Sequence, residues 1–270
     1  MFALERPGCT LRYRVDDFTD PWREPPSVLM LHGNAESSQA WYAWVPVLAR
    51  HYRVVCPDMR GYGASTPMPR EHPWTLDELV DDGCAVMDAL GIDRFHLVGA
   101  KVGGTVARVF AARRPDRVRS LVVAGTPQAR RPGAEQVERI VAELERHGTG
   151  HWAQRTMGGR LGARFPAEGV HWWTRYMGRA PVSSMVGFNR TVNYADVSGE
   201  LPGIACPALV ITTEGSALGD VEQTRDWQRR IPRSRLLVLP GDSYHVAVSH
   251  ARECAEAALS FMQEVDADPR

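Results

Sequence analysis

The sequence has no net charge, no long apolar run and few cysteines. Arginine plus lysine and aspartate plus glutamate each total 32 among 270 residues, so the formal charge is +0 at pH 7. No long-range field therefore draws the chain to nucleic acid or to an anionic membrane, and we expect a small-molecule substrate. Charges interrupt the first apolar stretch and no later run is long enough to span a bilayer, which predicts a cytoplasmic location.

The five cysteines are scattered and form no Cys-x-x-Cys pair. This pattern argues against a disulfide framework and against a zinc site. The histidines also lack the spacing of metal ligands, and the chain contains no glycine motif of the phosphate-binding or dinucleotide-binding kind. We therefore expect no metal and no cofactor. The sequence is compatible with a homodimer.

Short apolar runs alternate with amphipathic stretches along most of the chain. This alternation predicts an α/β fold with a mostly parallel central sheet flanked by helices, and the length fits one domain. The expected strands cover residues 27–31, 52–56, 95–98, 120–124, 208–212 and 235–239. The expected helices cover residues 75–90, 102–113, 135–145 and 251–265.

The alternation breaks between residues 127 and 199, a segment rich in Trp, His, Arg, Met and Gly. We interpret 127–199 as an inserted helical cap on a core formed by 1–126 and 200–270. Aromatic side chains of the cap, with one histidine of the core, are candidates to line an apolar substrate pocket. These pocket candidates are His32, Trp152, Trp172, Trp173, Tyr176 and Phe188. Packing of the cap onto the core is the alternative role for each aromatic side chain.

Four short motifs follow four of the expected strands in a fixed order. They cover residues 32–34, 57–65, 99–104 and 242–245. Together they resemble the α/β-hydrolase superfamily, in particular its capped enol-lactonase, carbon–carbon hydrolase and dehalogenase branch. The resemblance covers nearly the whole chain outside the cap and implies the α/β-hydrolase fold.

The third motif reads Gly99-Ala100-Lys101-Val102-Gly103 and is similar to the nucleophile elbow of that family. Lysine stands where the family's hydrolases carry serine, aspartate or cysteine. The positive end of the following helix and a dry pocket beneath the cap would both lower the pKa of this amine. A neutral amine can attack a carbonyl or act as a general base. The alternative is an inactive relative whose ammonium pairs with a carboxylate or a carbonyl.

The resemblance implies roles for further residues. The backbone N–H groups of Val102 and of Asn34 or Ala35 would form an oxyanion hole, and His245 would transfer protons. The position of the family's catalytic aspartate falls on Ser216. Glu214 and Asp220 lie close to it in sequence, and Glu214 is the preferred partner of His245 because it is nearer the strand end.

We therefore expect an enzyme that acts on a small carbonyl compound through Lys101. Carbon–carbon cleavage, decarboxylation or another lyase-type step suits an amine, because attack on an ester would form an amide that water hardly clears. One alternative is ester or lactone hydrolysis with Lys101 as a base. Others are a non-catalytic protein that binds a small ligand, and a serine hydrolase into which the lysine was introduced by engineering.

Overall fold

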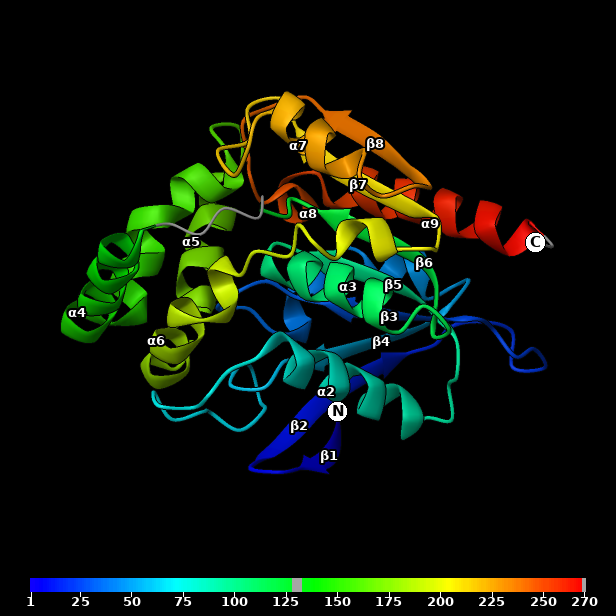
Figure 1. Cartoon of the computed structure of the whole chain (residues 1–270), viewed down its shortest axis with the longest axis horizontal. Helices are drawn as coiled ribbons and strands as arrows, with labels where there is room; N and C mark the ends of the chain where they lie inside the picture. The colour runs from blue at the N-terminus through cyan, green and yellow to red at the C-terminus, as the bar shows by residue number, and fades with distance from the viewer. Residues whose placement is uncertain (128–132, 269–270) are drawn as a thin grey trace.

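The computed structural model describes residues 1–127 and 133–268, which build an eight-stranded sheet in the order β1-β2-β4-β3-β5-β6-β7-β8 (Figure 1). The strands are β1 (Phe2–Arg6), β2 (Cys9–Asp16), β3 (Ser27–Leu31), β4 (Arg53–Asp58), β5 (Phe95–Ala100), β6 (Val118–Ala124), β7 (Ala208–Thr213) and β8 (Ser234–Leu239). Strands β3 to β8 pair in parallel, and β1 and β2 add an antiparallel hairpin at one edge. The predicted fold class is confirmed.

All six predicted strands are present. Five of them, β3 to β7, carry runs of side chains that the sheet buries on both faces, whereas β8 lies at the edge of the sheet and its side chains are only partly buried. The hairpin β1–β2 was not among the predicted strands. The outer strand β1 leaves Phe2, Ala3 and Glu5 exposed, so it has no continuous apolar run. An edge strand of this kind gives a weak signal in sequence.

Helices cover both faces of the sheet. One apolar cluster packs α2 (Leu76–Asp88), α3 (Val102–Arg113) and α7 (Val221–Gln228) against one face. A second cluster packs α1 (Val45–Leu48), α8 (Val246–Ser249) and α9 (Ala251–Ala267) against the other. Helix α3 has the predicted bounds, and it starts directly after the turn that follows β5. The sheet is therefore the middle of three layers.

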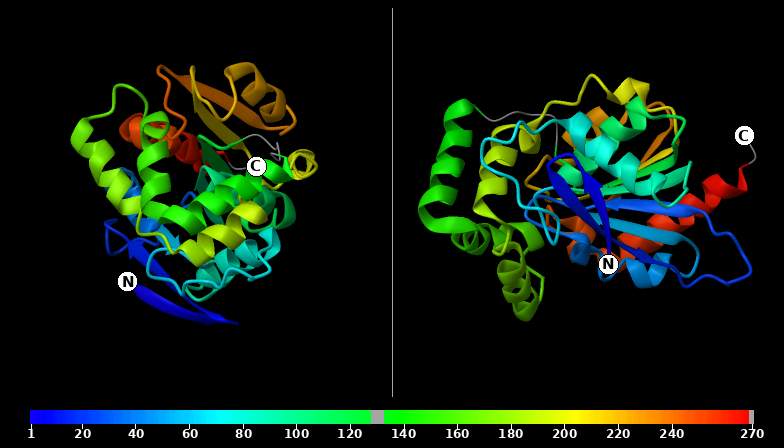
Figure 2. Two further views of the ribbon diagram at one scale, coloured as in Figure 1. Left: turned by 90° about the vertical axis from the view of Figure 1, so that its left-hand side faces the viewer. Right: turned by 90° about the horizontal axis from the view of Figure 1, so that it is seen from below.

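Three further helices lie between β6 and β7 in the chain and group together at one side of the sheet (Figures 1 and 2). They are α4 (Ala134–Leu161), α5 (Ala167–Met177) and α6 (Val182–Arg190). Helix α4 is much longer than the predicted 135–145 and is kinked at Gly148, whose φ is 78°. These helices occupy the segment expected to form the cap. Residues 128–132 of the expected cap and 269–270 of the expected core lie outside the described residues.

The chain also contains short 3-10 helices in its connecting segments. They are η1 (Ser38–Trp41), η2 (Val192–Tyr194) and η3 (Leu201–Gly203). In the part of the chain that the structure describes, no helix combines the length and the apolar character that a bilayer crossing requires.

Candidate active site

Lys101 occupies a sharp turn between β5 and α3. Its φ of 57° and ψ of −128° are strained for a residue with a side chain and cost about 1–3 kcal/mol. Two glycines make the turn possible. A Cβ on Gly99 would lie 2.5 Å from the carbonyl oxygen of Gly103, and a Cβ on Gly103 would lie 2.2 Å from that of Leu31. The turn therefore has the shape of the predicted nucleophile elbow.

The amine of Lys101 is enclosed. The residue is 7% exposed, and its Nζ lies 3.9 Å from the centroid of the Tyr244 ring. Burial lowers the pKa of Lys101 well below its ordinary value of 10.5, the nearby Arg160 lowers it further, and Glu36 opposes both. Among residues 1–127 and 133–268, no carboxylate forms an ion pair with Nζ. The site therefore shifts this amine toward its neutral form relative to a lysine in water.

Lys101 is also the only lysine in the sequence, which carries 31 arginines. Arginine keeps its proton in proteins, whereas a buried lysine readily loses it. The chain thus places its only lysine at the strained turn.

His245 faces a carboxylate that the sequence analysis did not consider. Its Nε2 lies 2.8 Å from Oε1 of Glu36, and the second oxygen, Oε2, accepts a hydrogen bond of 3.0 Å from the backbone N–H of Gly33. Burial alone would raise the pKa of Glu36, but His245 and Lys101 outweigh burial and lower the pKa to about 2. Glu36 is therefore ionised, and His245 donates to it through Nε2.

Glu36 follows the His32-Gly33-Asn34 motif by two positions, in the loop after β3. The signal that could have identified it is a lone acidic residue in a short loop expected to carry oxyanion donors. A Cβ on Gly33 would lie 2.7 Å from Glu36 Oε1 and 3.0 Å from Lys101 Cβ. The carboxylate therefore folds back over Gly33 toward the lysine, a path that sequence spacing alone does not reveal.

The prediction that Glu214 supports His245 is wrong. Glu214 is exposed, and Asp220 caps α7 by accepting from the backbone N–H of Gln223. Ser216, at the position of the family's aspartate, accepts weakly from the N–H of Leu218 through its hydroxyl. The Nδ1 atom of His245 is buried and has no hydrogen-bond partner in the described chain. The imidazole is thus paired through the other nitrogen.

His32 does not line a substrate pocket as predicted. It is fully buried, its Nδ1 donates to the carbonyl oxygen of Gly33, and its Nε2 accepts from the N–H of Met59. Both ring nitrogens are used by the backbone. His32 therefore joins the loops that follow β3 and β4.

Of the predicted oxyanion donors, Val102 follows Lys101 in the chain, and Asn34 and Ala35 follow Gly33, whose Cβ position would lie 3.0 Å from the Lys101 Cβ. Val102 is the first residue of α3, so its N–H has no partner within the helix. Asn34 accepts a hydrogen bond of 2.7 Å from the Tyr62 hydroxyl through Oδ1, and Ala35 has a φ of 62°. Their role as donors to a substrate oxygen stays a prediction.

Two of the predicted pocket aromatics lie close to the site. The Trp173 ring meets the His245 ring edge to face, with centroids 5.5 Å apart. The guanidinium of Arg160 lies 4.5 Å from the centroid of Trp152 and 5.6 Å from that of Tyr244. The site thus has aromatic surfaces contributed by the cap helices.

The remaining three aromatics pack the cap against the core, and one of them, Tyr176, also lines a cavity that borders Glu36. Trp172 stacks on Tyr176 with centroids 5.0 Å apart, and the Tyr176 hydroxyl accepts from the N–H of Ser37 at 2.6 Å. Phe188 is fully buried and meets the Tyr62 ring edge to face. Phe188 is therefore a packing residue rather than a substrate contact.

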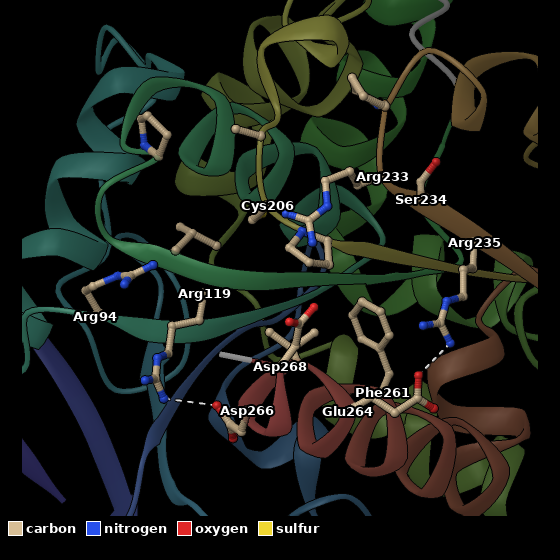
Figure 3. A pocket seen from close by; sticks show the side chains of 16 residues that line it. Arg94, Arg119, Cys206, Arg233, Ser234, Arg235, Phe261, Glu264, Asp266 and Asp268 are labelled. Carbon is tan, nitrogen blue, oxygen red and sulfur yellow. Dashed lines mark hydrogen bonds and ion pairs between the residues drawn. The ribbon is translucent and has the colours of Figure 1, made fainter. Parts of the chain in front are cut away.

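Among the cavities that the described residues line, one borders the site and another lies away from it. One, of about 430 Å³, borders Glu36 and runs between the loop after β3 and the end of α5. The other, of about 620 Å³, is lined by arginines, two of which pair with Asp266 and Glu264 (Figure 3). It lies at the amino ends of β6, β7 and β8, the opposite edge of the sheet from Lys101. The described residues contain no group of three His, Cys, Asp or Glu side chains placed to hold a metal ion.

The chain is similar in sequence to known enzymes. Residues 26–249 match the family model described as the alpha/beta hydrolase fold. A 2-hydroxymuconate semialdehyde hydrolase of Pseudomonas sp. (strain CF600) is 37% identical over 116 residues, which are 42% of this chain and 41% of that protein. The chain thus matches less than half the length of that relative. A pimeloyl-[acyl-carrier protein] methyl ester esterase of Aeromonas hydrophila is 25% identical over 88% of this chain and 95% of its own.

Solved structures show the same architecture. The enol-lactonase from Burkholderia xenovorans LB400 superposes with a TM-score of 0.88 at 23% identity, over 97% of this chain and 99% of that one. A likeness at this identity shows the fold. With the family match over most of its length, the chain belongs to the α/β-hydrolase fold family.

Proposed function

We propose that the protein is an enzyme that acts on a small carbonyl compound, with Lys101 as an amine nucleophile. The observation that carries the proposal is the placement of the chain's single lysine, buried and without a described carboxylate partner, at the strained elbow. A lysine desolvated in this way can be neutral near pH 7 and nucleophilic.

The reaction would begin with attack of the Nζ lone pair on the carbonyl carbon. A C–N bond forms, the π pair moves to oxygen, and transfer of one proton from nitrogen to oxygen gives a carbinolamine. Addition of one further proton expels water and leaves an iminium cation. The N–H groups of Val102 and Asn34 are the candidate donors to the developing oxyanion, a contact typically worth about 3 kcal/mol in barrier.

The iminium group can accept the electron pair of a bond that is made by the carbon next to the iminium carbon. Cleavage of a carbon–carbon bond or loss of carbon dioxide at that position gives an enamine. Protonation of its carbon and addition of water then release the product carbonyl and restore the amine. Carbon–carbon cleavage, decarboxylation or another lyase-type step therefore fits Lys101 better than ester hydrolysis does.

Arg160 supports a substrate that carries a carboxylate. The residue is 7% exposed, its Nε donates to Thr156, and within the described chain no acidic side chain pairs with it. A buried guanidinium without a counter-charge is costly, and a bound anion would offset that cost. The proposed substrate is thus a small keto acid or a related anionic carbonyl compound.

A second candidate is hydrolysis of an ester or lactone with Lys101 as a base toward water. The name of one relative favours it, because that relative is a methyl ester esterase. Under this mechanism Lys101 forms no covalent bond with the substrate. A non-catalytic ligand-binding role would leave Lys101 in contact with an anionic ligand without turnover.

Reductive trapping distinguishes these functions. The protein is incubated with a panel of aldehydes, ketones and 2-oxo acids, treated with cyanoborohydride and weighed intact. Since the wild type has one lysine, an adduct that is absent from Lys101→Arg is located at Lys101, and the N-terminal amine is present equally in both proteins. An adduct supports the proposal, whereas its absence across the panel refutes an amine nucleophile. Lysine-dependent ester hydrolysis without an adduct would identify the base mechanism, and saturable binding alone would identify a binding protein.

The cytoplasmic location, the small-molecule partner and the compatibility with a homodimer remain predictions from the sequence. The same holds for the boundaries of the cap at 127 and 199.

A further inference from the structure

Glu36 is a buried carboxylate beside an amine with which it makes no ion pair. Glu36 is 2% exposed, and the Nζ atom of Lys101 lies over the Tyr244 ring rather than against the carboxylate. Burying a carboxylate is expensive unless several groups hold it. Its presence next to the elbow therefore requires a reason beyond packing.

The carboxylate lies close to the lysine side chain. A Cβ built on Gly33 would lie 2.7 Å from Glu36 Oε1 and 3.0 Å from Lys101 Cβ. The distance between these two atoms therefore cannot exceed the sum of the two distances. The side chain of a lysine extends well beyond its Cβ. Rotation about its side-chain bonds can therefore bring a substituted nitrogen toward Glu36 or away from it.

The surrounding backbone holds the carboxylate in place. Gly33 donates to one oxygen, and His245 donates to the other. The described chain contains two non-glycine residues with positive φ, Ala35 and Lys101, and Ala35 immediately precedes Glu36. Strain at both positions fits a carboxylate and an amine that the fold keeps in a fixed relation.

The charged groups near Lys101 act on the charge of its nitrogen in opposite directions. The Arg160 guanidinium disfavours a second positive charge there, and Glu36 is the acidic group that opposes it. A cation formed on the lysine nitrogen in this dry environment would be unstable without a negative charge nearby.

We propose that Glu36 is the counter-ion of Lys101, which stabilises the positive charge that the lysine nitrogen carries as an ammonium and as an iminium. His245 then acts by holding Glu36, rather than by carrying protons between Lys101 and the substrate. Its buried Nδ1 has no described partner and its Nε2 is occupied by Glu36, so neither nitrogen is presented to a substrate. The iminium part of this inference rests on the proposed amine mechanism, whereas the ammonium part does not.

The direct test is a titration of the single lysine. Protein labelled with 15N at the lysine Nζ gives one side-chain amine signal, whose shift reports the ratio of ammonium to amine at each pH. At the midpoint pH of the wild type, Glu36→Gln should lower that ratio at least about tenfold, because the buried unit charge that favours the ammonium is removed from beside the Lys101 side chain. Glu36→Asp keeps the charge on a shorter side chain, so its ratio of ammonium to amine should lie between those of the wild type and Glu36→Gln. The matched control Glu214→Gln removes an exposed carboxylate and should leave the ratio unchanged.

A Glu36→Gln variant that is folded by circular dichroism and titrates like the wild type would overturn the counter-ion role. Should the glutamine variant not fold, an unchanged ratio in Glu36→Asp would overturn it equally. Reductive trapping separates this result from the proposed function. Failure to trap any wild-type adduct refutes the amine nucleophile, while the titration still decides the ammonium part. Trapping that succeeds with equal rates in wild type and Glu36→Gln refutes the stabilisation of the iminium by Glu36 and leaves the amine nucleophile supported.

Discussion

Replacing Lys101 by methionine should change how the stability of the protein depends on pH. Methionine keeps most of the apolar stem and removes the ionisable nitrogen. In the wild type the folded-state pKa of Lys101 lies well below the 10.5 of an ordinary lysine. Between these two pKa values the unfolded chain binds one proton that the folded protein does not. The free energy of unfolding of the wild type must therefore rise with pH in that window.

The slope follows from the proton count. One proton gives about 1.4 kcal/mol per pH unit, and the size of the pKa shift sets the width of the pH window over which this slope applies. Below the folded-state pKa both states are protonated, so the full cost of the buried ammonium is present and the slope vanishes. The gain is complete once the pH passes the unfolded-state pKa near 10.5.

Urea denaturation at intervals between pH 6 and pH 10 measures this effect as the difference between wild type and Lys101→Met. Taking the difference cancels the titration of groups that the two proteins share. The free energy of unfolding of the wild type, relative to that of the variant, should rise with pH at about the calculated slope over part of the range. A difference that is constant across the range would show that Lys101 keeps its proton in the folded protein, and would refute the reasoning.

Three further predictions test the site and its supports. Gly103→Ala should destabilise the fold by at least about 2 kcal/mol in urea denaturation, because its Cβ would lie 2.2 Å from the Leu31 carbonyl oxygen, and unchanged stability would contradict the elbow geometry. Lys101→Ser should hydrolyse 4-nitrophenyl acetate no faster than the background, because His245 already donates to Glu36 and lacks an acid on Nδ1; a clear increase would show a dormant serine triad. Arg160→Met should weaken binding of keto acids by about tenfold or more while binding of the matching uncharged ketones changes little, as measured by calorimetry; equal losses for both would argue against a carboxylate contact.

The parts of the fold that the sequence predicted are those with strong local signals. Buried parallel strands such as β3 and β5 read as apolar runs, and Gly99 and Gly103 marked the turn between β5 and α3. The hairpin β1–β2 was not predicted, because β1 leaves most of its side chains exposed and β2 buries only every second side chain in its first half, so neither strand has a continuous apolar run. Helix α4 was underestimated because the glycine at its kink, Gly148, reads as a helix stop.

The site was predicted only where position in the chain determines position in space. Lys101 and His245 follow strands whose carboxyl ends meet, so their proximity to the same edge could be inferred. The partner of His245 could not, because choosing between Glu214 and Glu36 depends on the path of a loop. Glu36 reaches the histidine by folding over Gly33, a close approach that becomes visible only in three dimensions.

The central claim is that the folded protein holds the amine of Lys101 neutral and ready to react. The 15N signal of the single lysine in the wild type measures this protonation directly. Its transition from ammonium to amine should occur well below pH 10.5 in the folded protein and return to the ordinary range in urea. A transition at or above pH 10.5 in the folded protein would mean that Lys101 is a permanent ammonium, and would contradict the account.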